Sequence, residues 1–195
     1  MKLPALAPLT GLSRRVKSLL GAVLLLAIAL PILGATNMLR RLQVPTTSMS
    51  PALVPGDHVV MEGFSFLRHQ PRRGDIVVFK TEGSQFFKPG TLLAMRVSGL
   101  PGEQLRIANG GLFVNGNRVI LSNAVGEIRY VNPMRTTFLN SSNDTVIVPA
   151  GHYFVIGDNT ANSVDSRFWG TFAASNILGR ICFCCWPPRR IGAVH

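Results

Sequence analysis

The most constraining feature of this sequence is an uncharged run of 22 residues near its N-terminus, from Ser18 to Leu39. The run is rich in Leu, Ala, Ile and Val, and as a helix it is long enough to span about 30 Å of hydrocarbon. A cleaved secretory signal peptide is the alternative, but its apolar region is normally about 7–15 residues and ends at a small-residue cleavage site. Here Arg40 and Arg41 follow the run. We therefore predict a transmembrane anchor over residues 18–39, after a short basic segment over residues 1–17.

Basic residues cluster on both sides of this run. Residues 1–43 contain six Lys and Arg and no acidic residue, in a chain whose formal net charge is +11. A nucleic-acid interface would show a basic stripe interleaved with aromatic residues, whereas basic clusters beside an apolar helix are typical of contacts with anionic lipid head groups. We therefore expect a lipid bilayer as a partner and no nucleic acid. More basic residues precede the run than follow it, so the positive-inside rule places the N-terminus in the cytoplasm.

From Val44 onward, short apolar runs are separated by Gly, Pro and Asn, a pattern that indicates an all-β domain. We predict this domain over residues 44–188, with an inserted loop or small subdomain at about 122–144 and a tail at 189–195. Asn115-Gly116, between two apolar runs, predicts a hairpin with a type I′ turn. The candidate strands are His58–Glu62, Asp75–Lys80, Leu92–Ser98, Gln104–Ala108, Gly111–Val114, Arg118–Leu121, Thr145–Val148, His152–Ile156 and Ile177–Trp186.

The cysteines do not indicate a metal site. Cys182, Cys184 and Cys185 lie in one apolar stretch, and the sequence has no second cluster that would complete a set of ligands. Small buried side chains in a strand are the simplest interpretation. We predict no metal and no cofactor.

Three segments carry candidate chemistry. In PTTSMSPALVPGD, residues 45–57, Ser48 lies between prolines that restrict the backbone; a serine there either attacks an amide or simply occupies a turn. The second segment consists of RRGDIVVFK, residues 72–80, and LAMRVSGLPGE, residues 93–103, and each part is typical of a strand bounded by a turn. The third is GDNTANSVDSRFWG, residues 157–170. Its many side-chain donors and acceptors predict a hydrogen-bonded network that holds other groups in place.

Together these segments resemble the bacterial type I signal peptidase family, the serine–lysine leader peptidases. The motifs P-x-x-S-M-x-P-x-L-x-x-G-D, R-G-D-I-V-V-F-K, R-V-x-G-L-P-G-E and G-D-N-x-x-N-S-x-D-S-R-x-W-G occur in that order, and the likeness covers nearly the whole chain. It implies a mostly β fold, an antiparallel β-sheet catalytic domain with one N-terminal transmembrane helix. It also implies a single-pass protein of the cytoplasmic (inner) membrane, with an extracytoplasmic catalytic domain that removes Ala-X-Ala-type signal peptides from exported preproteins.

The same resemblance implies a role for individual residues. Ser48 matches the nucleophile, and its backbone N–H and the Thr46 hydroxyl match the donors to the oxyanion. Ser163 matches the serine that orients the lysine amine. The supporting positions implied by the motifs are Asp165 and Arg167, which form a bracing pair, Asp158 in the same loop, and Arg96 beside the base position.

The departure from the family pattern is the general base, because Met95 stands where the lysine is expected. Methionine has nearly the length of lysine and fills a similar apolar space. Its thioether is only a weak acceptor and not a base at neutral pH, whereas a serine hydroxyl needs a base to become a good nucleophile. Since general-base catalysis contributes about 10²–10⁴-fold, we expect severely impaired hydrolysis.

Several explanations of Met95 remain open at this stage. A natural inactive paralogue, an engineered loss of the base and a sequence error all fit. A relocated base is a further alternative, for which the family resemblance adds histidine because relatives in the endoplasmic reticulum use it. The candidates are Lys80, Lys88, His58, His69 and His152.

Three functional hypotheses follow. The chain is a signal peptidase with low activity, or it binds signal peptides without cutting them. A self-cleaving serine–lysine repressor-type peptidase is the third, and the predicted anchor and the lack of a DNA-binding helical domain argue against it.

Overall fold

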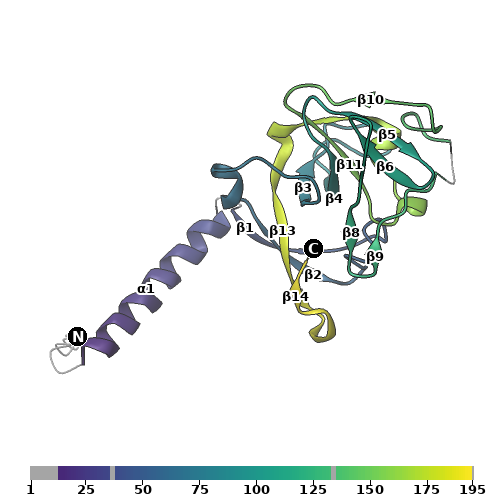
Figure 1. Cartoon of the computed structure of the whole chain (residues 1–195). Coiled ribbons are helices and arrows are strands. Elements are labelled where there is room, and N and C mark those ends of the chain that lie inside the picture. The colour runs from purple at the N-terminus through teal and green to yellow at the C-terminus, as the bar shows by residue number, and fades with distance from the viewer. Residues whose placement is uncertain (1–12, 36–37, 133–134, 195) are drawn as a thin grey trace. The chain divides into compact units, whose positions relative to one another are not determined.

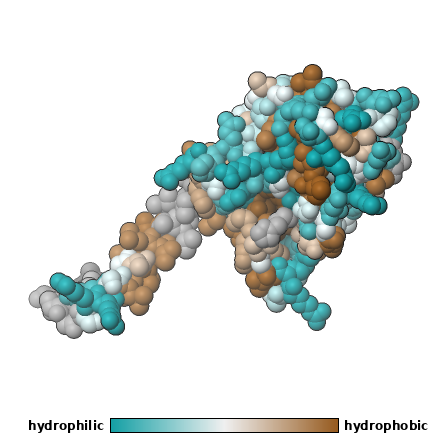
Figure 2. Space-filling view, viewed as in Figure 1, coloured by the Kyte–Doolittle hydropathy of each residue, from teal (hydrophilic) through white to brown (hydrophobic). Residues whose placement is uncertain are grey.

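The structure, a computed structural model, describes residues 13–35, 38–132 and 135–194. It divides into two units, residues 1–36 and 37–195. The first contains helix α1, Arg14–Ala35, whose exposed leucines give it a largely apolar surface (Figure 2). Within the described ranges, no helix is both long and apolar enough to cross a membrane. The anchor predicted over residues 18–39 therefore remains a prediction, and its last residue, Leu39, lies in a strand instead.

The second unit is built on an eight-stranded antiparallel sheet (Figure 1). Neighbouring strands follow the order β1-β2-β13-β3-β4-β11-β12, and β14 pairs with β13. The long strand β13 comes late in the sequence but lies between two early strands, β2 and β3, and pairs with both. The bounds are β1 Leu39–Gln43, β2 His58–Glu62, β3 Ile76–Lys80, β4 Leu92–Gly99, β11 His152–Ile156, β12 Phe172–Ala173, β13 Ile177–Trp186 and β14 Gly192–Ala193.

A second, four-stranded sheet has the order β10-β5-β6-β7, and β8 and β9 form a separate two-stranded ribbon. The β6–β7 turn confirms the predicted type I′ hairpin, because Asn115 and Gly116 have φ values of 49° and 83°. The bounds are β5 Gln104–Ala108, β6 Gly111–Val114, β7 Asn117–Val119, β8 Ser122–Asn123, β9 Gly126–Glu127 and β10 Val146–Ile147. The short helices are η2 Phe64–Leu67, η3 Thr160–Asn162, α2 Ser166–Trp169, η4 Ala174–Asn176 and η5 Pro188–Arg190.

Two hydrophobic clusters hold these sheets together. The larger one packs residues of β2, β3 and β4 against the segment that follows β1. The smaller one packs β5 and β6 against β11 and includes Ile128, Tyr130 and Leu139. These three residues belong to the segment predicted as an inserted loop, which therefore contributes to a core as well as covering the surface.

The mostly β, antiparallel fold predicted from the sequence is confirmed. Five candidate strands have the predicted bounds, namely those now labelled β2, β5, β6, β11 and β13. β1 was missed because LRRLQ carries no strict alternation, and its pairing with β2, not its own pattern, makes it a strand. The two-residue strands β8, β9, β12 and β14 are too short to show a period of two.

Candidate active site

Two buried residues that follow Ser48 anchor the loop after β1. Met49 is 3% exposed and Leu53 is fully buried, and both belong to the larger cluster. Within the loop, the Ser50 N–H donates to the Thr47 carbonyl and the Leu53 N–H donates to the Met49 carbonyl, each at 2.9 Å. Ser48 itself is half-buried. These buried residues and hydrogen bonds therefore fix the backbone that carries the Ser48 side chain.

The predicted oxyanion partner lies beside this serine. The Thr46 hydroxyl donates to Ser48 Oγ at 3.5 Å, and Thr46 is exposed. The two hydroxyls are therefore close enough to contact the same carbonyl group of a substrate. Their chemical roles remain predictions.

The polar loop after β11 lies against the Ser48 loop. The Asn159 N–H donates to the Ser48 carbonyl at 3.0 Å, and the Asn159 side-chain amide donates to the Thr47 carbonyl at 3.2 Å. The Asn162 side-chain amide reaches Thr47 Oγ1 at 3.4 Å. These contacts join segments more than 100 residues apart in the chain, since 112 residues separate Asn159 from Thr47.

Gly157 allows this close approach. A Cβ at this position would lie 2.3 Å from Ser163 Oγ and 2.5 Å from the Ser48 carbonyl oxygen. No larger residue fits there without displacing one of the two loops. The structure thus packs both Ser48 and Ser163 against the Cα of one glycine.

A buried ion pair holds the start of this loop on β4. Arg96 Nε donates to Asp158 Oδ1 at 2.7 Å, and Arg96 Nη2 donates to Asp158 Oδ2 at 2.8 Å. The Arg96 and Asp158 side chains are 3% and 0% exposed. Because an unpaired buried charge is costly, each residue requires the other.

A second buried pair, Arg167–Asp165, braces the other end of the loop. Both carboxylate oxygens of Asp165 accept from Arg167, each at 2.9 Å. Asp165 also accepts from the Gly157 N–H at 3.1 Å, and Arg167 donates to the Thr160 carbonyl at 2.7 Å. The network predicted for residues 157–170 is therefore present.

Two further buried or partly buried polar residues near the site had no signal in the sequence. Tyr130 is 4% exposed; burial raises its pKa, although its interaction with the Ser98 side chain opposes the rise. Arg190, in the predicted tail, donates from Nε to both oxygens of Asp57, at 2.9 and 3.0 Å. Arg190 Nη2 donates to the carbonyls of Pro51 and Ala52. Arg190 thereby clamps the loop that carries Ser48.

A pocket of about 620 Å³ opens beside Ser48. Two runs of consecutive residues line the pocket. One is residues 42–46, at the end of β1 and just after it, and the other is residues 92–95 of β4. Ser48 and Met95 both line it. Among the described lining residues no side chain is an acid, a base or a thiol, so the pocket is apolar with a few hydroxyl and amide groups.

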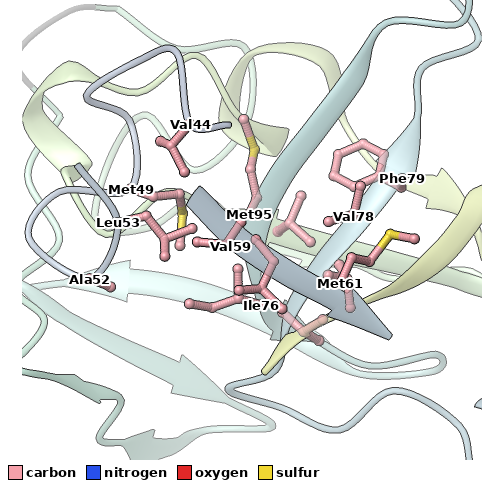
Figure 3. Close-up of a cluster of buried hydrophobic side chains, with 14 of the residues drawn as sticks. Val44, Met49, Ala52, Leu53, Val59, Met61, Ile76, Val78, Phe79 and Met95 are labelled. Atoms are coloured by element: carbon pink, nitrogen blue, oxygen red, sulfur yellow. The ribbon is translucent and has the colours of Figure 1, made fainter. Parts of the chain in front are cut away.

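Met95 occupies the predicted base position as part of the hydrophobic core. It is 3% exposed, pairs with Val77 across β3 and β4, and lies among Val44, Met49 and Val59 (Figure 3). The position is thus well packed, and nothing in it can accept a proton at neutral pH.

Ser163 has an unmet hydrogen bond. In the described part of the chain its Oγ is the one buried side-chain nitrogen or oxygen without a partner, and the residue is 3% exposed. Buried polar groups nearly always have a partner, and one without needs an explanation. An amine at position 95 would be the expected partner for this hydroxyl by the family resemblance.

The alternative bases do not reach the pocket. None of Lys80, Lys88, His58, His69 and His152 is among the described residues that line it. Lys80 is exposed at the end of β3, Lys88 is exposed in the next loop, and the His152 ring contacts the Ala150 carbonyl at 3.1 Å. Within the described residues, no hydrogen bond joins any of the five to Ser48.

The chain is similar to several known proteins. The family model described as "Signal peptidase, peptidase S26" matches residues 15–186. Signal peptidase I of Leptolyngbya laminosa is 35% identical over 156 residues, which cover 76% of this chain and 70% of that protein. Probable signal peptidase I-2 of Synechocystis is 31% identical, with coverages of 89% and 75%. A solved signal peptidase I from Enterococcus faecalis is 27% identical and aligns with a TM-score of 0.43, covering 57% of this chain and 97% of that one.

Proposed function

The chain belongs to the signal peptidase family, peptidase S26, a family of serine endopeptidases that remove signal peptides, and we propose that this member binds signal peptides beside Ser48 but hydrolyses them slowly. The observation that carries the proposal is the apolar surroundings of Ser48. Met95 stands at the base position, and the nearby Ser163 hydroxyl has no partner among the described residues.

The peptide would bind as an added strand along β4. Residues 92–95 of β4 pair with β3 on one side, whereas pairing with β11 on the other side begins only at Arg96. Among the described strands, this edge of residues 92–95 is therefore unpaired. An extended peptide gains main-chain hydrogen bonds at such an edge, and pockets under alternate residues select its side chains. Small residues at the first and third positions before the cut, as in Ala-X-Ala, suit this arrangement.

Ser48 would be the attacking group. Its Oγ would add to the scissile carbonyl carbon, and the Ser48 N–H and the Thr46 hydroxyl would donate to the oxygen as it becomes an oxyanion. The proton of the hydroxyl must leave during the attack. With a thioether at position 95, water is the remaining acceptor, and the positioned-base contribution of about 10²–10⁴-fold is lost.

The anchor predicted over residues 18–39 completes the proposal. It would hold the chain in the cytoplasmic membrane as a single-pass protein, with the β domain on the extracytoplasmic side. Protease added to intact right-side-out cells should then digest the β domain, and full protection would contradict this topology.

Restoring the lysine tests the proposed site. Met95→Lys nearly conserves volume, so it should fold, and Ser163 should orient the amine. Burial should lower the pKa of that amine, because desolvation disfavours its charged form. Cleavage of a preprotein with an Ala-X-Ala site should rise at least about 10²-fold, and Ser48→Ala on the Met95→Lys background should abolish the gain.

Two results would contradict the proposal. If folded Met95→Lys protein gains nothing, the position or the site is wrong. If the unmodified protein already cleaves at a rate that depends on Lys80, Lys88 or one of the histidines, a relocated base operates. Stable retention of the uncut peptide by the unmodified protein favours the second candidate function, a binder of signal peptides without turnover.

A further inference from the structure

The loop between β3 and β4 places two phenylalanines at the pocket. Phe86 and Phe87 line it together with Thr91, the residue before β4. Phe86 is 40% exposed, and its ring meets that of Phe168 edge-on, with centroids 5.7 Å apart. An exposed aromatic ring on a pocket wall is a surface available to an apolar ligand.

Hydrogen bonds within the loop hold these rings in place. Ser84 Oγ accepts from the backbone N–H groups of both phenylalanines, at 3.1 and 3.3 Å. The hydroxyls of Thr81 and Thr91 both donate to the Lys88 carbonyl at 2.8 Å. The loop is thus an ordered wall of the pocket.

The distance along β4 sets which peptide residue would meet this wall. Met95 and Leu92 are three residues apart, or about 10 Å along a strand, and the loop precedes Leu92. A peptide paired with this edge would have its residue at the cut near Met95, beside Ser48, and would extend back towards Leu92, because β11 occupies the edge from Arg96 onward. The residue five positions before the cut lies four steps, or about 13 Å, further along and on the same face as the first and third residues.

The apolar lining of the pocket matches the apolar side chains that a signal peptide has before its cleavage site. Two alanine methyl groups occupy little of 620 Å³, which leaves room for a larger side chain. Secretory signal peptides have an apolar region of about 7–15 residues before the small residues of the cleavage site. A charged side chain would be excluded, because burial without a partner is costly and the described lining offers no opposite charge.

We propose that Phe86 and Phe87 form a subsite for a large apolar side chain of the bound peptide, about five residues before the scissile bond. This inference rests on the proposed function, because it assumes that the peptide lies along residues 92–95 of β4. It assigns the β3–β4 loop to substrate selection, beyond the small residues beside the cut.

Peptide binding to the unmodified full-length protein tests the subsite without any catalysis. Two fluorescent Ala-X-Ala peptides, with Leu or Ser five residues before the cut, are compared by anisotropy at constant detergent concentration. The Leu peptide should bind about tenfold more tightly, since a large apolar side chain is buried. In Phe86→Ala/Phe87→Ala protein this preference should fall to about twofold or less. Phe183→Ala, which removes an exposed ring of β13 outside the pocket lining, should keep it.

The outcomes separate the two proposals. If neither peptide binds the unmodified protein, the proposed function fails. If both bind equally well, or if the double variant keeps the preference for Leu, the subsite is wrong and the proposed function stands. If the double variant does not fold, the single variant Phe86→Ala, which removes the more exposed ring, takes its place, and an unchanged preference for Leu in that variant would overturn the subsite.

Discussion

The clamp between Arg190 and Asp57 gives a sharp test of how the Ser48 loop is held. The Asp57 side chain is fully buried, whereas the Arg190 side chain is 34% exposed. In Arg190→Met protein, the carboxylate would keep the Val54 N–H, at 2.9 Å, but lose the guanidinium. The carbonyls of Pro51 and Ala52 would lose their donor as well.

The magnitude follows from this burial. Removing one partner of a fully buried ion pair costs about 3–5 kcal/mol. Because Arg190 is partly exposed and water can replace some of its bonds, we expect a smaller loss of about 2–3 kcal/mol in the free energy of unfolding. For a domain of this size, that corresponds to a fall in Tm of about 4–12 °C.

Thermal unfolding of the full chain, with Arg189→Met as the matched control, measures this effect. Arg189 is exposed, so its substitution should change the free energy of unfolding by less than about 0.5 kcal/mol. Combining Arg190→Met with Asp57→Asn should cost less than the sum of the two single changes, because the pair is coupled. Hydrogen exchange should quicken at residues 50–57 and not in β5 and β6. Equal Tm values for Arg190→Met and Arg189→Met would refute the clamp.

Two further predictions concern single positions. Gly157→Ala should destabilise the protein by about 1–3 kcal/mol, because its Cβ would lie 2.3 Å from Ser163 Oγ; Gly192→Ala, with open space around it, is the control, and equal denaturant midpoints would contradict the close approach. Burial raises the pKa of Glu62, but hydrogen bonds, that from Arg180 foremost, outweigh it and hold the pKa below its ordinary 4.5. The ionised Glu62 side chain therefore stabilises the folded protein above about pH 4.5, and this stabilisation is lost as the pH falls through the lowered pKa of Glu62 in the folded state. Glu62→Gln should flatten the fall in Tm between about pH 5 and 3, and an unchanged slope would show that other carboxylates dominate.

The sequence by itself determined the strands with strong local patterns. β2, β5, β6, β11 and β13 were predicted with their observed bounds, because alternation and turn residues act within a few neighbouring positions. The Asn115-Gly116 turn followed from its two residues for the same reason. The family resemblance of the motifs predicted that Ser48, Met95 and the loop after β11 belong to one active site, and Ser48, Met95 and Asn162 do line one pocket.

Only the tertiary structure decided which distant segments meet. β13 lies between β2 and β3, and Arg190 reaches Asp57 across 133 residues. The unpaired edge of β4 exists because β11 stops pairing at Arg96. Gly157 and the Ser48 loop come together beside the Ser163 hydroxyl. Such contacts are set by packing between elements and leave no periodicity in the local sequence, which is why the strands were predictable and their arrangement around Ser48 was not.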